Sequence, residues 1–176
     1  MVVMADKSVP TSDHIRDIIS FVEASPTSYH AVAELTRRLE QAGFQRLEET
    51  ESWPSVEGRR YVVRDGAVIA WITPEKVTPQ LGARIVGSHT DSPSFKLKPN
   101  ATVTNQGWQQ VGMEVYGGGL LNSWLDRDLG LSGRLVTCDG QAHLVRTGPI
   151  LRISQLAPHL DRTVNDDLKP VSYTHL

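Results

Sequence analysis

Apolar residues near the start of the chain recur at the spacing of two amphipathic helices. In the first stretch they are Ile15, Ile18, Ile19 and Val22. Side-chain oxygens at residues 11–13 suit a helix start, and Pro26 ends the pattern. A second helix is predicted over residues 28–42, where the apolar positions are Val32, Leu35 and Leu39. Gly43 follows at the position that favours a left-handed conformation.

After Gly58 the hydrophobic pattern becomes that of strands. Residues 61–64 and 67–72 flank Asp65-Gly66, a pair typical of a two-residue hairpin turn. Residues 83–87 form a short apolar run, which favours a strand buried on both faces. The amino-terminal part therefore combines helices with a hairpin and a buried strand.

Beyond Pro99 the candidate strands are short and turn residues separate them. Residues 135–138 and 143–146 flank a second hairpin signal, Asp139-Gly140, and residues 150–153 are a further candidate strand. Because the composition changes near Pro99, we predict an α/β fold with a boundary there. Residues 1–98 would form one domain and residues 99–170 a β-rich one.

Composition narrows the class of protein. The chain has 176 residues, a net charge of −2 and 39% hydrophobic residues, which fits a globular chain of about one domain. The near-neutral charge excludes a generic nucleic-acid binder, and the single Cys138 excludes a disulfide framework or a four-cysteine zinc site. No apolar stretch is long enough to span a bilayer, and residues 1–10 lack a secretory signal. We expect a cytoplasmic protein without membrane or nucleic-acid partners.

The first candidate for chemistry is the pair His89 and Asp91. Both follow the predicted buried strand at its carboxyl end, where open α/β sheets bind ligands. In an extended segment they point the same way, so the His89 imidazole could ligate a metal while the Asp91 carboxylate orients it. One histidine and one aspartate do not complete a zinc site, and a polar loop explains these residues equally well.

Four ordered segments carry more specific motifs. They are residues 25–31 (SPTSYHA), 87–93 (GSHTDSP) with 96–99 (KLKP), 116–120 (YGGGL) with 124–129 (WLDRDL), and 156–162 (LAPHLDR). Gly43-Phe44 and Trp53 lie between the first and second segments. Together they resemble the aspartyl aminopeptidase family of zinc metallopeptidases, over residues from about 13 to 169.

The resemblance implies both a fold and an activity. It implies that residues 1–98 are the first part of a zinc-aminopeptidase α/β sandwich domain, and that residues 99–170 belong to an incomplete β-rich dimerisation domain. The implied enzyme removes Asp or Glu from peptide N-termini with water activated by two Zn²⁺ ions, Co²⁺ or Mn²⁺ being alternative metals. Its implied partners are such peptides and further copies of itself, in a dimer-based homo-oligomer.

The same resemblance assigns site residues. His89 matches a zinc ligand, and Asp91 matches the catalytic aspartate that orients this ligand. His159 matches a catalytic histidine that reaches into the active site of the neighbouring subunit. In the family the remaining ligands and the general-base glutamate come later than this sequence extends, so we expect a truncated fragment that is inactive alone. Residues 171–176 (VSYTHL) match one frame of a common transposon-end sequencing adapter, and we expect them to be a non-native tail.

Other interpretations remain open. A non-catalytic binding or assembly module that kept the fold would lack the same ligands. A glutamyl or lysyl aminopeptidase is disfavoured by the tryptophan-aspartate-arginine segment at 124–128. We expect Asp126 and Asp128 to pair with Arg127 or to cap backbone groups, and His30 to act as a cap or a packed ring. Residues 117–119, all glycine, are expected to permit an unusual turn or close packing.

Overall fold

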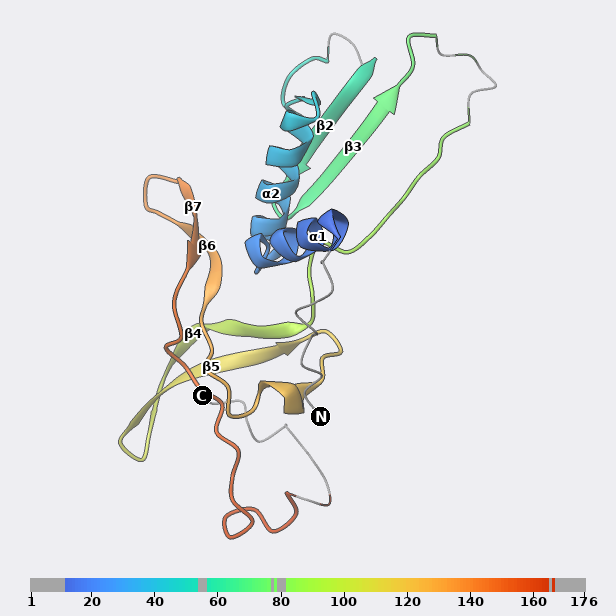
Figure 1. Cartoon of the computed structure of the whole chain (residues 1–176). Coiled ribbons are helices and arrows are strands. Elements are labelled where there is room, and N and C mark those ends of the chain that lie inside the picture. Colours follow the sequence, from blue (N-terminus) through green and yellow to red (C-terminus); the bar gives the residue numbers. More distant parts are fainter. Residues whose placement is uncertain (1–11, 54–56, 77, 79–81, 165, 167–176) are drawn as a thin grey trace. The chain divides into compact units, whose positions relative to one another are not determined.

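The computed structural model (Figure 1) describes residues 12–53, 57–76, 78, 82–164 and 166. The chain divides into two compact units, Met1–Asp91 and Ser92–Leu176, and each is described by itself. The boundary predicted after residue 98 falls inside strand β4 (Ser94–Asn105). The assignment of a peptidase part and a dimerisation part to these units stays a prediction. The proposed tail at residues 171–176 lies outside the described residues.

Both predicted helices are present in the first unit. Helix α1 spans Asp13–Ala24 and helix α2 spans Ser28–Gln41. The Ser12 hydroxyl accepts a hydrogen bond from the Ile15 amide, and the Thr27 hydroxyl accepts one from the His30 amide, each at 3.3 Å. These side chains satisfy amides that the first helical turn leaves unpaired.

Arg38 links the two helices. Arg38 on α2 donates hydrogen bonds to both carboxylate oxygens of Asp17 on α1, at 2.8 and 2.9 Å. Its guanidinium also lies 5.2 Å from the ring centroid of Phe21. The predicted apolar face of α1 is nevertheless exposed to solvent. Its side chains are each 48–63% exposed: Ile15, Ile18, Ile19 and Val22.

Arg38 shares the carboxylate of Glu34 with Arg37. Both arginines donate to Glu34 over 2.6–2.7 Å. Hydrogen bonds from Arg37, and then from Arg38, lower the pKa of Glu34 from 4.5 to about 2. The Glu34 carboxylate therefore ties the two arginines together on one face of α2.

This cluster predicts a loss of stability in acid. The unfolded chain takes up a proton on Glu34 near pH 4.5, whereas the folded chain resists it until about pH 2. The free energy of unfolding should therefore fall as the pH drops through this range. Glu34→Gln should destabilise the chain by about 1 kcal/mol at neutral pH and remove that part of the pH dependence. Chemical denaturation between pH 2 and 7 measures both effects.

Glu48→Gln provides a matched control for Glu34. Glu48 also pairs with an arginine, Arg46, at 2.7 Å, but both side chains are about half exposed. Exposed pairs contribute little to stability, so the control should denature as the unmodified chain does. Identical acid profiles for Glu34→Gln and the unmodified chain would contradict the prediction.

The sheet of the first unit contains the predicted hairpin. Its strands are β1 (Gln45–Arg46), β2 (Gly58–Arg64) and β3 (Ala67–Thr73), in the order β1-β2-β3. Strand β1 runs parallel to β2, and β3 runs antiparallel to β2 with Arg64 opposite Ala67. Among its described residues, this unit buries Ala31, Val32, Tyr61 and Val62. Helix α2 and strand β2 thus supply its small core.

The predicted buried strand over residues 83–87 is wrong for this structure. The segment has no strand pairing, and Ile85 and Val86 are 88% and 97% exposed. Figure 1 shows the green segment that follows β3 running apart from the β2–β3 hairpin. A strand with two apolar faces needs neighbours on both sides, and the described part of this unit supplies none to it.

The second unit begins with a long ribbon of two strands. Strands β4 (Ser94–Asn105) and β5 (Trp108–Tyr116) pair in antiparallel register, with an irregularity between Leu97 and Thr102. Pro99 lies in that irregular stretch, where a strand tolerates a residue without an amide hydrogen. On one face, the Lys96 ammonium lies 3.4 Å from the Tyr116 ring centroid.

The described remainder of the second unit contains a short 3-10 helix, Leu121–Trp124, and a hairpin. The predicted hairpin at Asp139-Gly140 is present as β6 (Ser132–Val136) and β7 (Ala142–Arg146). The first strand ends at Val136 rather than at residue 138, because the Thr137 amide donates to the Gln141 carbonyl at 2.9 Å and closes a longer loop. The candidate strand at residues 150–153 forms only isolated bridges, with Leu125 and Leu129 as partners.

Candidate functional site

The structure brings His89 and Asp91 together, as their spacing predicts. The His89 Nδ1 atom lies 3.2 Å from an Asp91 carboxylate oxygen. The His89 side chain is 93% exposed, and that of Asp91 is 36% exposed. A carboxylate on Nδ1 fixes the orientation of the ring and leaves Nε2 as the nitrogen that can bind a metal.

Thr90, between these two residues, attaches the segment to the hairpin. Its hydroxyl donates to the Gly66 carbonyl at 2.7 Å, in the turn between β2 and β3. Gly66 in turn lies against the start of α2, because a Cβ atom there would come within 2.6 Å of the Ser28 hydroxyl and 3.0 Å of its Cβ. The motif is thus hydrogen-bonded to the turn, and the turn packs closely against the first residue of α2.

This close approach predicts that Gly66 tolerates no side chain. Gly66→Ala should destabilise the first unit by about 1–3 kcal/mol, because Ser28 or the turn must shift. Thermal unfolding followed by circular dichroism measures the loss. Gly82→Ala is the matched control, since a Cβ there meets no atom within 4 Å. Equal melting temperatures for the two variants would contradict this description of the turn.

His159 belongs to the second unit. It is exposed and lies in a turn in which the Leu160 and Asp161 amides donate to the Ala157 carbonyl, at 2.8 and 3.0 Å. The structure therefore places His159 in a different compact unit from His89 and Asp91. Its catalytic role stays a prediction.

His89 and its carboxylate partner Asp91 would fit one of the ligand positions of a zinc site. Imidazole nitrogen is a preferred zinc ligand, and the other ring nitrogen of such a histidine usually donates to a carboxylate. In the described ranges, no group of three or more His, Cys, Asp and Glu side chains comes close enough to hold a metal ion. His89 would thus need donors from beyond the described residues.

The acidic residues after Trp124 have structural partners. The Asp126 carboxylate accepts a hydrogen bond from the Gln155 amide at 3.2 Å, which confirms a capping role. Asp128 forms an ion pair at 2.7 Å, but with Arg152 rather than with Arg127. Arg127 instead donates to the Ser123 carbonyl at 3.4 Å. Sequence reasoning missed the Arg152 partner because it is distant in the chain.

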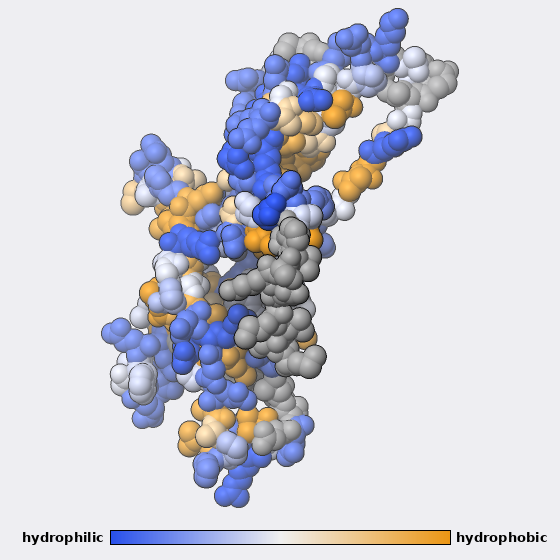
Figure 2. Space-filling model, in the orientation of Figure 1, coloured by the Kyte–Doolittle hydropathy of each residue, from blue (hydrophilic) through white to orange (hydrophobic). Residues whose placement is uncertain are grey.

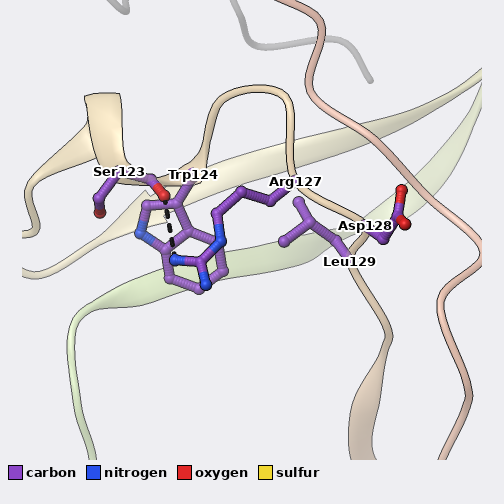
Figure 3. A pocket seen from close by; sticks show the side chains of 5 residues that line it. All are labelled: Ser123, Trp124, Arg127, Asp128 and Leu129. Carbon is purple, nitrogen blue, oxygen red and sulfur yellow. Dashed lines mark hydrogen bonds between the residues drawn. The ribbon is translucent and has the colours of Figure 1, made fainter. Parts of the chain in front are cut away.

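A pocket that the sequence did not predict lies beside these residues (Figure 3). It has a volume of about 310 Å³, and its lining comprises Ser123, Trp124, Arg127, Asp128 and Leu129. Trp124 packs edge-on against Phe95, with ring centroids 5.3 Å apart.

Gly117 adopts a φ of +73° and lies close to Pro93, which confirms the turn and close packing expected of the glycines. His30 is likewise structural, since its Nδ1 lies 2.8 Å from the Thr27 hydroxyl.

The motif segments match one known family. A family model for aminopeptidase I zinc metalloproteases, peptidase family M18, matches residues 21–176. The chain belongs to this family. This membership confirms the predicted zinc aminopeptidase family and the α/β fold class.

The chain spans less than two fifths of the length of the M18 relatives that it matches. A Streptomyces avermitilis protein described as "Probable M18 family aminopeptidase 2" is 53% identical over 165 residues, which are 93% of this chain and 38% of that protein. The crystal structure of prApe1 has a TM-score of 0.81 and 31% identity, and the match covers 91% of this chain and 36% of that one. A yeast structure described as the mApe1 dodecamer has a TM-score of 0.75 and 32% identity, over 84% of this chain and 36% of that one.

The described helices are too short or too polar to cross a membrane.

Proposed function

We propose that this M18 chain supplies the amino-terminal part of an aminopeptidase that removes acidic residues from peptide N-termini. The observation that carries the proposal is the His89–Asp91 pair, in which Nδ1 and a carboxylate oxygen lie 3.2 Å apart. The chain that contains this pair belongs to a family of zinc metalloproteases. The chain spans 38% of its Streptomyces relative. We accordingly propose that the other metal ligands and the general base belong to the part that the relative has in addition.

In this proposal the residues of the chain hold and orient the metal. The Asp91 carboxylate accepts the Nδ1 proton of His89, so the Nε2 lone pair is available as a ligand. Thr90 fixes the segment on the Gly66 carbonyl and limits how far the pair can move. Two zinc ions, when bound, would supply an activated water and polarise the scissile carbonyl.

His159 has a proposed role across a subunit boundary. Its exposed position on the turn at residues 157–161 leaves the imidazole accessible to another molecule. In the active site of a neighbouring subunit, His159 would stabilise the negative charge that develops on the scissile carbonyl oxygen. The dodecamer described for the yeast relative supports a homo-oligomer for the whole protein.

The test uses a chimera in which this chain is continued by the remainder of the Streptomyces avermitilis relative, hereafter the completed chimera. With zinc, it should hydrolyse aspartyl and glutamyl p-nitroanilides faster than the leucyl substrate. The chain alone should release no product above the blank. Equal or greater leucyl activity would overturn the acidic preference, and turnover by the chain alone would overturn the need for further ligands. Zinc binding without any hydrolysis would favour a non-catalytic module.

A further inference from the structure

The turn between β2 and β3 holds Asp65 in a backbone conformation that suits glycine better. Arg64 pairs with Ala67 across the hairpin, so Asp65 and Gly66 form a two-residue loop. Asp65 has a φ of +51°, whereas Gly66 lies outside the left-handed range. A positive φ at only the first central residue is the pattern of a type II′ turn, which favours glycine at that residue. Asp65 therefore occupies the strained position of this turn.

This type of turn brings the side chain of Asp65 close to the next amide. The first central residue of a type II′ turn has a ψ angle of about −120°. At that angle the Cβ atom of an L-residue nearly eclipses the following amide nitrogen. Rotation about the Cα–Cβ bond of Asp65 then carries its carboxyl carbon to the Gly66 nitrogen. The turn thus holds two reacting atoms of the same chain in a favourable approach.

We propose that Asp65–Gly66 is a site of spontaneous aspartate isomerisation. The Gly66 amide nitrogen attacks the carboxyl carbon of the Asp65 side chain. A C–N bond forms, and the amide proton leaves with the carboxyl hydroxyl as water, which gives a five-membered succinimide. Water then opens this ring at either carbonyl and yields aspartate or isoaspartate. Asp65 is exposed to the water that the second step needs, and Gly66 has no side chain to hinder the first.

The second Asp-Gly pair, Asp139–Gly140, has a different geometry. The Gly140 amide donates to the Thr137 carbonyl at 2.8 Å, and Gly140 has a φ of +82°. This is the pattern of a type I turn followed by a left-handed residue, in which the ψ angle of the aspartate is about 0° and turns its Cβ away from the next nitrogen. Hydrogen bonds from the Thr137 hydroxyl and the Gln141 amide also lower the pKa of Asp139 and keep its carboxyl in the unreactive, ionised form.

Isomerisation of Asp65 would act on the segment that carries His89. Gly66 accepts a hydrogen bond from the Thr90 hydroxyl at 2.7 Å and lies against Ser28. An isoaspartyl linkage inserts one methylene group into the backbone directly before Gly66, in a loop of only two residues. We expect this insertion to displace the Gly66 carbonyl and to break its hydrogen bond with Thr90.

The residues before His89 give the segment little other support. Ile85 is 88% exposed and Val86 is 97% exposed. Figure 2 shows this stretch as apolar surface standing apart from the rest of its unit. Loss of the Thr90 hydrogen bond should therefore loosen the backbone around His89.

The test compares the two Asp-Gly pairs within one molecule. The full chain is incubated at mildly acidic pH below its melting temperature, and isoaspartate at each position is measured by peptide mapping with electron-transfer fragmentation. In the folded chain Asp65 should isomerise at least about tenfold faster than Asp139. In urea the two rates should be equal, because the turns are lost. An equal or lower rate at Asp65 in the folded chain, or an unchanged ratio in urea, would overturn the proposal.

Asp65→Glu is the matched control for the effect on the His89 segment. It keeps the negative charge, but its side chain could close only a six-membered ring, which forms far more slowly. After incubation, amides 89–91 should exchange hydrogen faster in the unmodified chain and at their original rate in Asp65→Glu. Exchange at the original rate in the isomerised chain would show that the turn does not hold this segment.

Discussion

His89→Ala in the completed chimera should remove bound zinc and reduce hydrolysis of an aspartyl substrate by at least about a hundredfold. Replacing a residue that only orients a metal ligand already costs roughly 10–100-fold, and this change removes a proposed ligand nitrogen itself. Asp91→Asn should have a smaller effect, because it keeps the contact with Nδ1 of His89 but loses the negative charge. Metal analysis of the purified protein and initial rates at saturating zinc measure both quantities.

The controls for this prediction come from the same chain. His143→Ala replaces another exposed histidine, on β7, and should retain both zinc and activity. His89 is 93% exposed and contributes no core packing, so its loss should leave the melting temperature of the metal-free protein unchanged. Full zinc content and full activity in the His89 variant would refute the ligand assignment.

Features set by neighbouring residues could be predicted from the sequence. The Ser12 cap and the turns at Asp65-Gly66 and Asp139-Gly140 form among residues close in the chain. The His89–Asp91 contact is of the same kind, because residues two apart in an extended segment meet regardless of the surrounding fold. Short-range geometry therefore gave the reliable part of the prediction.

Features that need distant partners could not be predicted in this way. Residues 83–87 have the pattern of a buried strand, but burial requires neighbours that the pattern does not provide. The irregular stretch of β4 that contains Pro99 depends on the pairing with β5, which the residues around Pro99 do not reveal. The Asp128–Arg152 pair joins residues far apart in the chain, and no local signal identifies it. The hydrophobic pattern of a segment shows which structures it can adopt, and its contacts with distant residues determine which of them forms.

Tyr61→Ala should unfold or strongly weaken the first unit, by about 3–5 kcal/mol, because it empties the centre of a small core. Tyr61 is fully buried, and its hydroxyl donates to a Glu40 carboxylate oxygen at 2.8 Å. Tyr61→Phe keeps the ring and should cost only about 1 kcal/mol, since Glu40 is exposed and can bind water instead. Chemical denaturation measures both losses, and equal losses would show that the hydroxyl rather than the ring carries the stability.

The hydroxyl of Tyr61 adds a dependence on alkaline pH that separates its role from that of the ring. Burial, and then the hydrogen bond to Glu40, raises the pKa of Tyr61 from 10.0 to about 12. Above pH 10 the unfolded chain ionises this group while the folded chain keeps it neutral, so the free energy of unfolding should fall as the pH rises towards 12. Tyr61→Phe should remove that part of the slope. Tyr116→Phe, in the other unit, should retain it, because Tyr116 is 37% exposed. A slope that survives in Tyr61→Phe would place the alkaline sensitivity at other groups.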